Sequence, residues 1–226
     1  MPGRTIVIDR RYRGPLASAN GGYAAGLVAS AVTGPAEVTL RLPPPLGVPL
    51  ELRREAGRAL LLDGHAVVAE GRPADPGLEP PAPPTWGEAS AAAAGAGSFD
   101  APEFAECFVC GTRPEHDGLE IHAGAVAGRD GLVAAPWVAR EVAREVVWAA
   151  IDCPGGYAIA AGERGEPLLG RITARLSRLP RDGERCVVVG WPLGEEGRKL
   201  FAGTALYGEG GDVLAVARQT WLMPAA

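Results

Sequence analysis

The sequence predicts an α+β protein made of two copies of one unit, in which a helix of small residues is followed by an antiparallel sheet. Apolar and polar residues alternate over residues 37–42, and turn signals such as Asp63-Gly64 separate several segments of this kind. The motif Gly21-Gly22-Tyr23-Ala24 returns as Gly155-Gly156-Tyr157-Ala158, and the strand pattern of residues 38–42 returns at residues 172–176. Both pairs are 134 residues apart (155 minus 21 and 172 minus 38), which indicates an internal duplication.

Composition and charge exclude several classes of protein. The 226 residues are 47% hydrophobic, which is enough for a packed core in one large or two small domains. The formal net charge of -5 argues against a non-specific nucleic-acid-binding protein, which needs a positively charged surface. There is no signal-peptide core and no run of roughly 18 apolar residues, so we expect a cytoplasmic protein without a membrane span. In that compartment the four cysteines favour reduced thiols or metal ligands over disulfides.

The first unit is expected over residues 1–72. It opens with a strand at residues 5–8, and Ser18 or Asn20 can then cap a helix over residues 23–32. Gly34-Pro35 ends this helix. Antiparallel strands are predicted at residues 37–42, 49–54, 58–62 and 65–70.

A linker rich in proline, alanine and glycine is expected over residues 73–105, with a short helix that opens on a capping box from Thr85 to Glu88. The second unit is expected over residues 106–226. Its strands are predicted at residues 172–177, 185–191, 199–207 and 213–221. The apolar run of residues 146–158 is interrupted by Pro154-Gly155-Gly156, and the repeat identifies this interruption as the N-terminus of a second central helix.

These residues resemble a known family. A Gly-Gly helix embraced by a long antiparallel sheet and duplicated in tandem is similar to the double-hotdog acyl-CoA thioesterases. The segment Cys107-Phe108-Val109-Cys110-Gly111, followed by Gly118-Leu119, resembles the opening of hotdog domains in a group of thioesterase-like bacterial proteins. The resemblance implies a tandem hotdog fold and a site for acyl thioesters where the two repeats meet.

Thioester hydrolysis requires a carboxylate and backbone N–H groups that stabilise the developing oxyanion. Asp152 can be the base or nucleophile, and its alternative role is the N-cap of the helix that follows. Members of the family carry the acid inside the helix, where this chain has none, and Glu163 is the nearest acid by that spacing. The helix-start residues predicted to bind the substrate are Asn20, Gly21, Gly22, Gly155, Gly156 and Tyr157.

A second candidate site contains Cys107 and Cys110, two residues apart, followed by His116 and His122. Thiolate and imidazole are the ligands of zinc, although a single Cys pair is also compatible with two structural thiols. The resemblance implies no metal and no cofactor other than the coenzyme A part of a substrate. Cys153 is expected to pack in the core.

Three functions therefore remain open. The first is hydrolysis of acyl-CoA, and the second is binding of acyl-CoA or a lipid ligand without turnover. The third is a hotdog hydratase or dehydratase, which normally pairs an Asp with a His; no histidine accompanies either helix, and His65 follows a surface turn. The expected partner is an acyl-CoA-type small molecule, and the protein can be a monomer or a homodimer because two repeats already form a pseudo-dimer.

Overall fold

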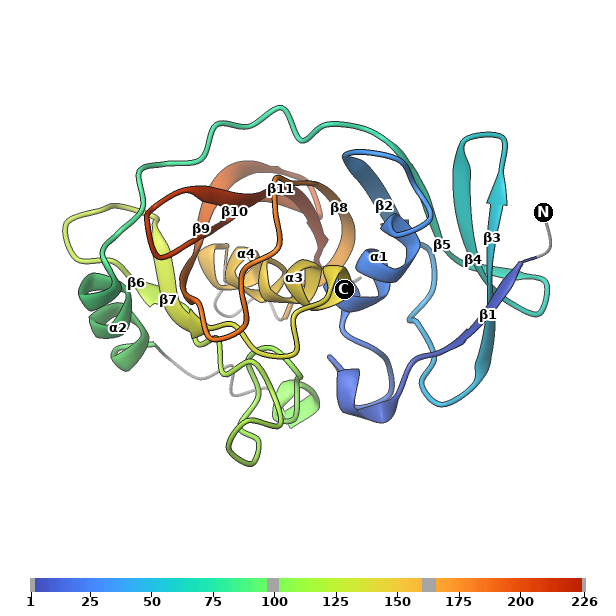
Figure 1. The fold of residues 1–226 in the computed structure, drawn as a ribbon, viewed down its shortest axis with the longest axis horizontal. Helices are drawn as coiled ribbons and strands as arrows, with labels where there is room; N and C mark the ends of the chain where they lie inside the picture. Colours follow the sequence, from blue (N-terminus) through green and yellow to red (C-terminus); the bar gives the residue numbers. More distant parts are fainter. Residues whose placement is uncertain (1–2, 97–101, 160–165, 225–226) are drawn as a thin grey trace.

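The computed structural model describes residues 3–96, 102–159 and 166–224 (Figure 1). Its strands form one antiparallel sheet of 11 strands, in the order β1-β3-β4-β5-β2-β8-β11-β10-β9-β7-β6. The strands are β1 (Arg4–Val7), β2 (Ala36–Leu40), β3 (Pro49–Glu55), β4 (Arg58–Asp63), β5 (Ala66–Pro73), β6 (Gly124–Ala125), β7 (Val133–Val138), β8 (Leu168–Leu176), β9 (Arg185–Glu196), β10 (Lys199–Tyr207) and β11 (Val213–Leu222). The helices are α1 (Gly21–Ala29), α2 (Trp86–Ala94), α3 (Arg144–Ala150) and α4 (Cys153–Ala158), with 3-10 turns at Arg10–Tyr12 and Pro102–Phe104.

The sheet has the same strand order in its two halves. The first half runs β1-β3-β4-β5-β2, and the second runs β7-β9-β10-β11-β8 from its own outer side toward the centre, with β6 added at the edge. Each half therefore contains a first strand, a helical segment and four further strands. The sequence repeat predicted the helix and the four strands in both units, but a first strand only in the first unit. At the β4–β5 turn Gly64 adopts a φ of 57°, a left-handed conformation that glycine accepts without strain.

The two halves join through β2 and β8, and the register of this pair agrees with the sequence repeat. Val38 lies opposite Ile172, and the neighbouring pairs are Glu37 with Thr173 and Thr39 with Arg171. Val38 and Ile172 are equivalent residues in the repeat, so an approximate two-fold axis passes through this pair. The offset read from the sequence thus locates the pseudo-symmetry axis of the sheet.

The central helices α1, α3 and α4 lie on the inner side of the sheet, whereas α2 lies outside it, beside β6 and β7 (Figure 1). Figure 1 shows α3 and α4 enclosed by β8 to β11, while α1 lies beside β2. Helices α1 and α3 pack at very short range: a Cβ atom on Gly22 would lie 2.4 Å from the Trp148 carbonyl oxygen, and one on Gly26 would lie 2.5 Å from the Glu145 Cα. Glycine is therefore required at both positions for the helices to approach this closely.

The prediction for the second central helix was correct at its start but omitted the helix before it. A helix begins at Cys153, as predicted from the Pro-Gly-Gly interruption, but α3 precedes it and provides the surface that packs on α1. Pro154 lacks an N–H group and cannot continue the hydrogen bonding of α3, so the apolar run folds as two helices with a break at residues 151–152.

Helix α2 lies in the segment between the two units and packs on β7. The capping box is confirmed: the Thr85 side chain accepts a hydrogen bond from the Glu88 N–H, and the Glu88 side chain accepts one from the Thr85 N–H. Across the described ranges, no helix is long and apolar enough to span a membrane.

Candidate functional site

Asp152 lies in the break between α3 and α4, where side chains of the sheet bind two backbone carbonyls, those of Ile151 and Asp152. The Ile151 carbonyl accepts hydrogen bonds from Thr204 Oγ1 at 2.8 Å and from Gln219 Nε2 at 2.6 Å. Gln219 Nε2 also donates to the Asp152 carbonyl at 3.1 Å. Since both partners come from strands β10 and β11, the sheet fixes the direction of the break and the position of the Asp152 side chain.

Gln219 is itself fixed by its neighbours. The residue is 0% exposed, and its Oε1 accepts a hydrogen bond from Trp221 Nε1 at 2.8 Å. Gly155 leaves space for it, because a Cβ atom at that position would lie 1.6 Å from Gln219 Oε1. A side chain at residue 155 would therefore displace Gln219.

The Asp152 carboxylate points to the first turn of α1, on the other repeat. Its Oδ2 accepts a hydrogen bond from the Gly22 N–H at 2.8 Å, whereas its Oδ1 is buried without a partner. The N-cap role proposed for Asp152 on its own helix is wrong, because the side chain makes no capping hydrogen bond to α4. Helix α1 has its own cap in Asn20, whose Oδ1 accepts from the Tyr23 N–H at 2.9 Å.

Burial dominates the electrostatics of this carboxyl group. Asp152 is 2% exposed, and desolvation raises its pKa from the ordinary 3.8 to about 7. The hydrogen bond from Gly22 lowers the pKa, the nearby Cys107 thiolate raises it, and the Asn20 side chain lowers it. Asp152 thus titrates in the neutral range.

The helix-start N–H groups predicted to bind the substrate have partners inside the protein. The Gly22 N–H donates to Asp152 and the Tyr23 N–H to Asn20, while the Gly155 N–H donates to the Asp152 carbonyl at 3.1 Å. In this conformation, these three donors stabilise the site itself.

The other predicted binding residues are closely packed. A Cβ atom on Gly21 would lie 3.1 Å from side-chain atoms of Leu40 and Leu169, and one on Gly156 would lie 3.0 Å from the Trp221 ring. The Tyr157 hydroxyl donates a hydrogen bond to the Cys110 sulfur. A role of these residues in substrate binding stays a prediction.

Three cysteines converge beside Asp152. The Sγ atoms of Cys107, Cys110 and Cys153 all lie within 4.8 Å of one another. Cys153 thus belongs to this cluster in addition to packing in the core. The cluster contains neither His116 nor His122, so the predicted ligand set is wrong in its histidines; His116 lies instead between the exposed acids Glu115 and Glu120.

The pKa of each of these thiols depends on its hydrogen bonds to the others. Hydrogen bonds from Cys110 and Cys153 hold the pKa of Cys107 well below its usual range, and the backbone N–H groups of Cys110 and Val109 act in the same direction. The hydrogen bonds to Cys107 raise the pKa values of Cys110 and Cys153. Cys107 is therefore the first of the three to ionise.

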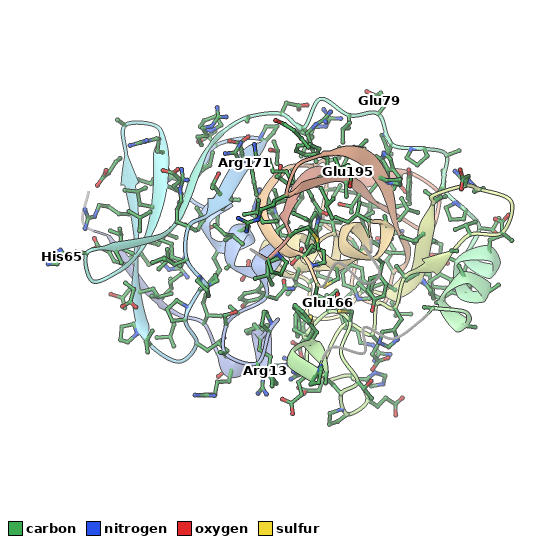
Figure 2. The ribbon with its side chains drawn as sticks, turned by 180° about the vertical axis from the view of Figure 1, so that it is seen from behind. Arg13, His65, Glu79, Glu166, Arg171 and Glu195 are labelled. Atoms are coloured by element: carbon green, nitrogen blue, oxygen red, sulfur yellow. The ribbon has the colours of Figure 1, made fainter. Side chains whose placement is uncertain are left out.

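Two residues that the sequence analysis considered remain, Glu163 and His65. Glu163 falls outside the described residues. His65 is exposed at the β4–β5 turn, at the outer end of the first unit (Figure 2). Among the described residues, no histidine hydrogen-bonds to Asp152.

A cleft of about 790 Å³ opens near the site, although Asp152 is not among its lining residues. Its apolar part is lined by Phe108, Leu119, Trp137 and Val146. Phe108 directly follows Cys107, and Val146 lies on α3 ahead of Asp152. The turn of residues 107–110 thus contacts the cleft on one side and the Asp152–Cys153 pair on the other.

Gln219 and Thr204 are the site residues that the sequence analysis missed. Gln219 lies on β11 with the same parity as the buried Ala217 and Trp221, so the alternation of that strand places a polar side chain on the core side. A polar residue at a core position is a signal that strand periodicity can detect.

The sequence matches no protein-family model and no curated protein. Several solved structures share its fold. A hotdog-fold protein of unknown function from Alicyclobacillus acidocaldarius aligns with a TM-score of 0.63 at 14% identity, over 100% of this chain and 94% of that one. A proposed thioesterase II from Thermobifida fusca gives 0.66 at 13% identity, over 100% and 93% of the two chains.

An acyl-CoA thioesterase II from Mycobacterium marinum aligns with a TM-score of 0.61 at 11% identity, over 98% of this chain and 93% of that one. These alignments cover both halves of the sheet and the helices within it. At such identities they demonstrate the architecture alone. The chain therefore has the tandem hotdog α+β fold, which it shares with structures of the thioesterase II type.

Proposed function

We propose that the protein hydrolyses acyl thioesters of the acyl-CoA type, with the Asp152 carboxylate as the proton acceptor. One observation carries this proposal: Asp152 is a buried carboxylate with Oδ2 held by the Gly22 N–H and Oδ1 without a hydrogen-bond partner. A held carboxylate with one free oxygen can orient a water molecule and accept its proton.

The reaction requires two proton transfers. Water donates a proton to Asp152 Oδ1 as its oxygen bonds to the thioester carbonyl carbon. When the tetrahedral intermediate collapses, the carbon–sulfur bond breaks, and the leaving sulfur takes the proton from Asp152. The products are a carboxylic acid and a free thiol, and the carboxylate is regenerated.

The N-terminus of α1 supports this chemistry. Asp152 lies against its first turn, where the positive end of the helix dipole stabilises the carboxylate form that accepts the proton. Gln219 and Thr204 are positioning residues, because they hold the carbonyls of the break and leave the carboxylate pointed at α1. The reaction needs no cofactor apart from the coenzyme A portion of the substrate.

The cleft lined by Phe108 and Val146 is the proposed entrance for the substrate. Its apolar side suits an acyl or pantetheine chain, and it ends at the turn of residues 107–110 that contacts the Asp152–Cys153 pair. Because Asp152 is buried and does not line the cleft, a substrate reaches the carboxylate only if side chains between the two move.

The test uses the wild-type protein and a panel of acyl-CoA substrates from acetyl to palmitoyl. Release of coenzyme A is followed with a thiol reagent, and binding of a non-hydrolysable thioether analogue is measured in parallel. Turnover of at least one substrate supports the proposal. Binding of the analogue without turnover of any substrate would instead identify an acyl-CoA-binding protein without catalysis, and absence of both would contradict an acyl-CoA site.

A further inference from the structure

The distance between the Cys107 and Cys153 sulfurs matches that of two ligands of a shared metal ion. Cys107 and Cys153 approach to 3.8 Å between their Sγ atoms, and the Cys110 sulfur lies within 4.8 Å of both. Two sulfurs at a Zn–S distance of about 2.3 Å in a tetrahedral site are about 3.8 Å apart, whereas a disulfide requires about 2.05 Å. The spacing of Cys107 and Cys153 is therefore that of two ligands of one ion and not of a bonded pair, and the Cys110 sulfur lies close enough to both to be a third ligand.

The turn of residues 107–111 presents two of these sulfurs to the same point. The Gly111 N–H donates to the Cys107 carbonyl at 2.8 Å, which closes this turn. A Cβ atom on Gly111 would lie 2.3 Å from the Cys107 nitrogen, so the turn requires glycine there. The tight turn therefore keeps Cys107 and Cys110 close to each other and to Cys153.

Hydrogen-bond donors from neighbouring side chains surround the three sulfurs. Asn20 Nδ2 lies 3.9 Å from the Cys153 sulfur, and the Tyr157 hydroxyl donates to the Cys110 sulfur. Three thiolates around a divalent ion leave a net charge of about −1, which such hydrogen bonds stabilise in a buried site. Two apolar packed thiols would need none of these donors.

We propose that Cys107, Cys110 and Cys153 bind one zinc ion, with a water molecule or other small ligand in the fourth position. On binding, each thiol that is protonated releases its proton to solvent, and no oxidation takes place. The ion joins the turn of residues 107–111 to the start of α4, immediately beside Asp152. This site does not depend on the proposed hydrolysis, because its ligands and its readout are separate.

The first experiment measures metal content and affinity. Reduced protein is dialysed against Zn²⁺ and analysed by native mass spectrometry and elemental analysis, and then Co²⁺ replaces zinc so that sulfur-to-cobalt charge-transfer absorption reports the thiolate ligands. We expect one ion per chain, and at least about a tenfold loss of affinity in Cys107→Ser and Cys153→Ser. Cys186→Ser is the matched control, because Cys186 is a buried thiol on β9 outside the cluster, and we expect it to bind zinc as wild type does.

A second measurement needs no substitution and remains valid if a serine variant fails to fold. Wild-type protein is alkylated under native conditions with and without a chelator, and each cysteine is quantified by peptide mass spectrometry. We expect the chelator to increase alkylation of Cys107, Cys110 and Cys153 but not of Cys186. No bound zinc in the reduced wild type, equal affinity in a folded Cys153→Ser, or a disulfide within the cluster in place of the ion would each overturn the proposal.

Discussion

The replacement Gln219→Leu tests the role of the sheet in shaping the break at Asp152. Gln219 makes three buried hydrogen bonds, two from Nε2 to the Ile151 and Asp152 carbonyls and one from Trp221 Nε1 to its Oε1. Leucine keeps the approximate volume but leaves the Trp221 N–H without an acceptor, which costs about 1–3 kcal/mol. Ile151 keeps Thr204 and Asp152 keeps its turn hydrogen bond, so loss of the Nε2 bonds adds about 0.5–1.5 kcal/mol.

We therefore expect Gln219→Leu to lower the free energy of unfolding by about 1.5–4.5 kcal/mol. Urea denaturation followed by tryptophan fluorescence measures this change from the midpoint and the slope. Thr220→Val is the matched control, since it lies on the same strand with the opposite parity, and its change should stay within about 0.5 kcal/mol. If Gln219→Leu is no less stable than Thr220→Val, the sheet does not hold the break as we infer.

Three further changes test other parts of the fold. Gly26→Ala should destabilise the protein by about 1–3 kcal/mol in calorimetry because a Cβ would meet α3, whereas Gly87→Ala on α2, where a Cβ meets nothing within 4 Å, should not destabilise it. The salt bridge with Arg178 lowers the pKa of Glu184 from 4.5 to about 2. The pair should therefore stabilise the fold above pH 4.5 and lose this contribution as the pH falls toward 2. A Glu184→Gln variant with the same acid-induced loss of stability as wild type would contradict this. Thr85→Ala removes the cap of α2 and should speed amide exchange in Trp86–Ala94 by an amount equivalent to about 1 kcal/mol, with unchanged exchange as the contrary result.

Local patterns were sufficient to predict most of the fold. Strand alternation and turn residues depend on neighbours within a few positions, so the strands from β2 to β5 and from β8 to β11 could be placed from the sequence. The repeat supplied the long-range information: the equivalence of Val38 and Ile172 anticipates their pairing at the pseudo-two-fold axis. Helix α3 was missed as a separate element because its apolar residues continue into those of α4.

The site was less predictable because its decisive contacts join distant residues. Asp152 was identified as the candidate acid, but its hydrogen bond to Gly22 spans 130 residues and depends on the packing of α1 against α3. The Cys107–Cys110 pair was visible as a motif, whereas Cys153, 46 residues from Cys107, joins it only through the tertiary fold. Local spacing offered His116 and His122 only as candidate ligands, and the fold places neither of them in the cluster.

The most direct test of the proposed function is the rate of coenzyme A release by Asp152→Asn at saturating acyl-CoA. The asparagine oxygen can still accept the Gly22 hydrogen bond, so the fold should persist, but the side chain can no longer accept a proton from water. We predict a loss of at least about 10²-fold relative to wild type, while Asp63→Asn, an exposed change at the β4–β5 turn, retains the wild-type rate. Turnover by a folded Asp152→Asn at the wild-type rate would contradict the assignment of this carboxylate.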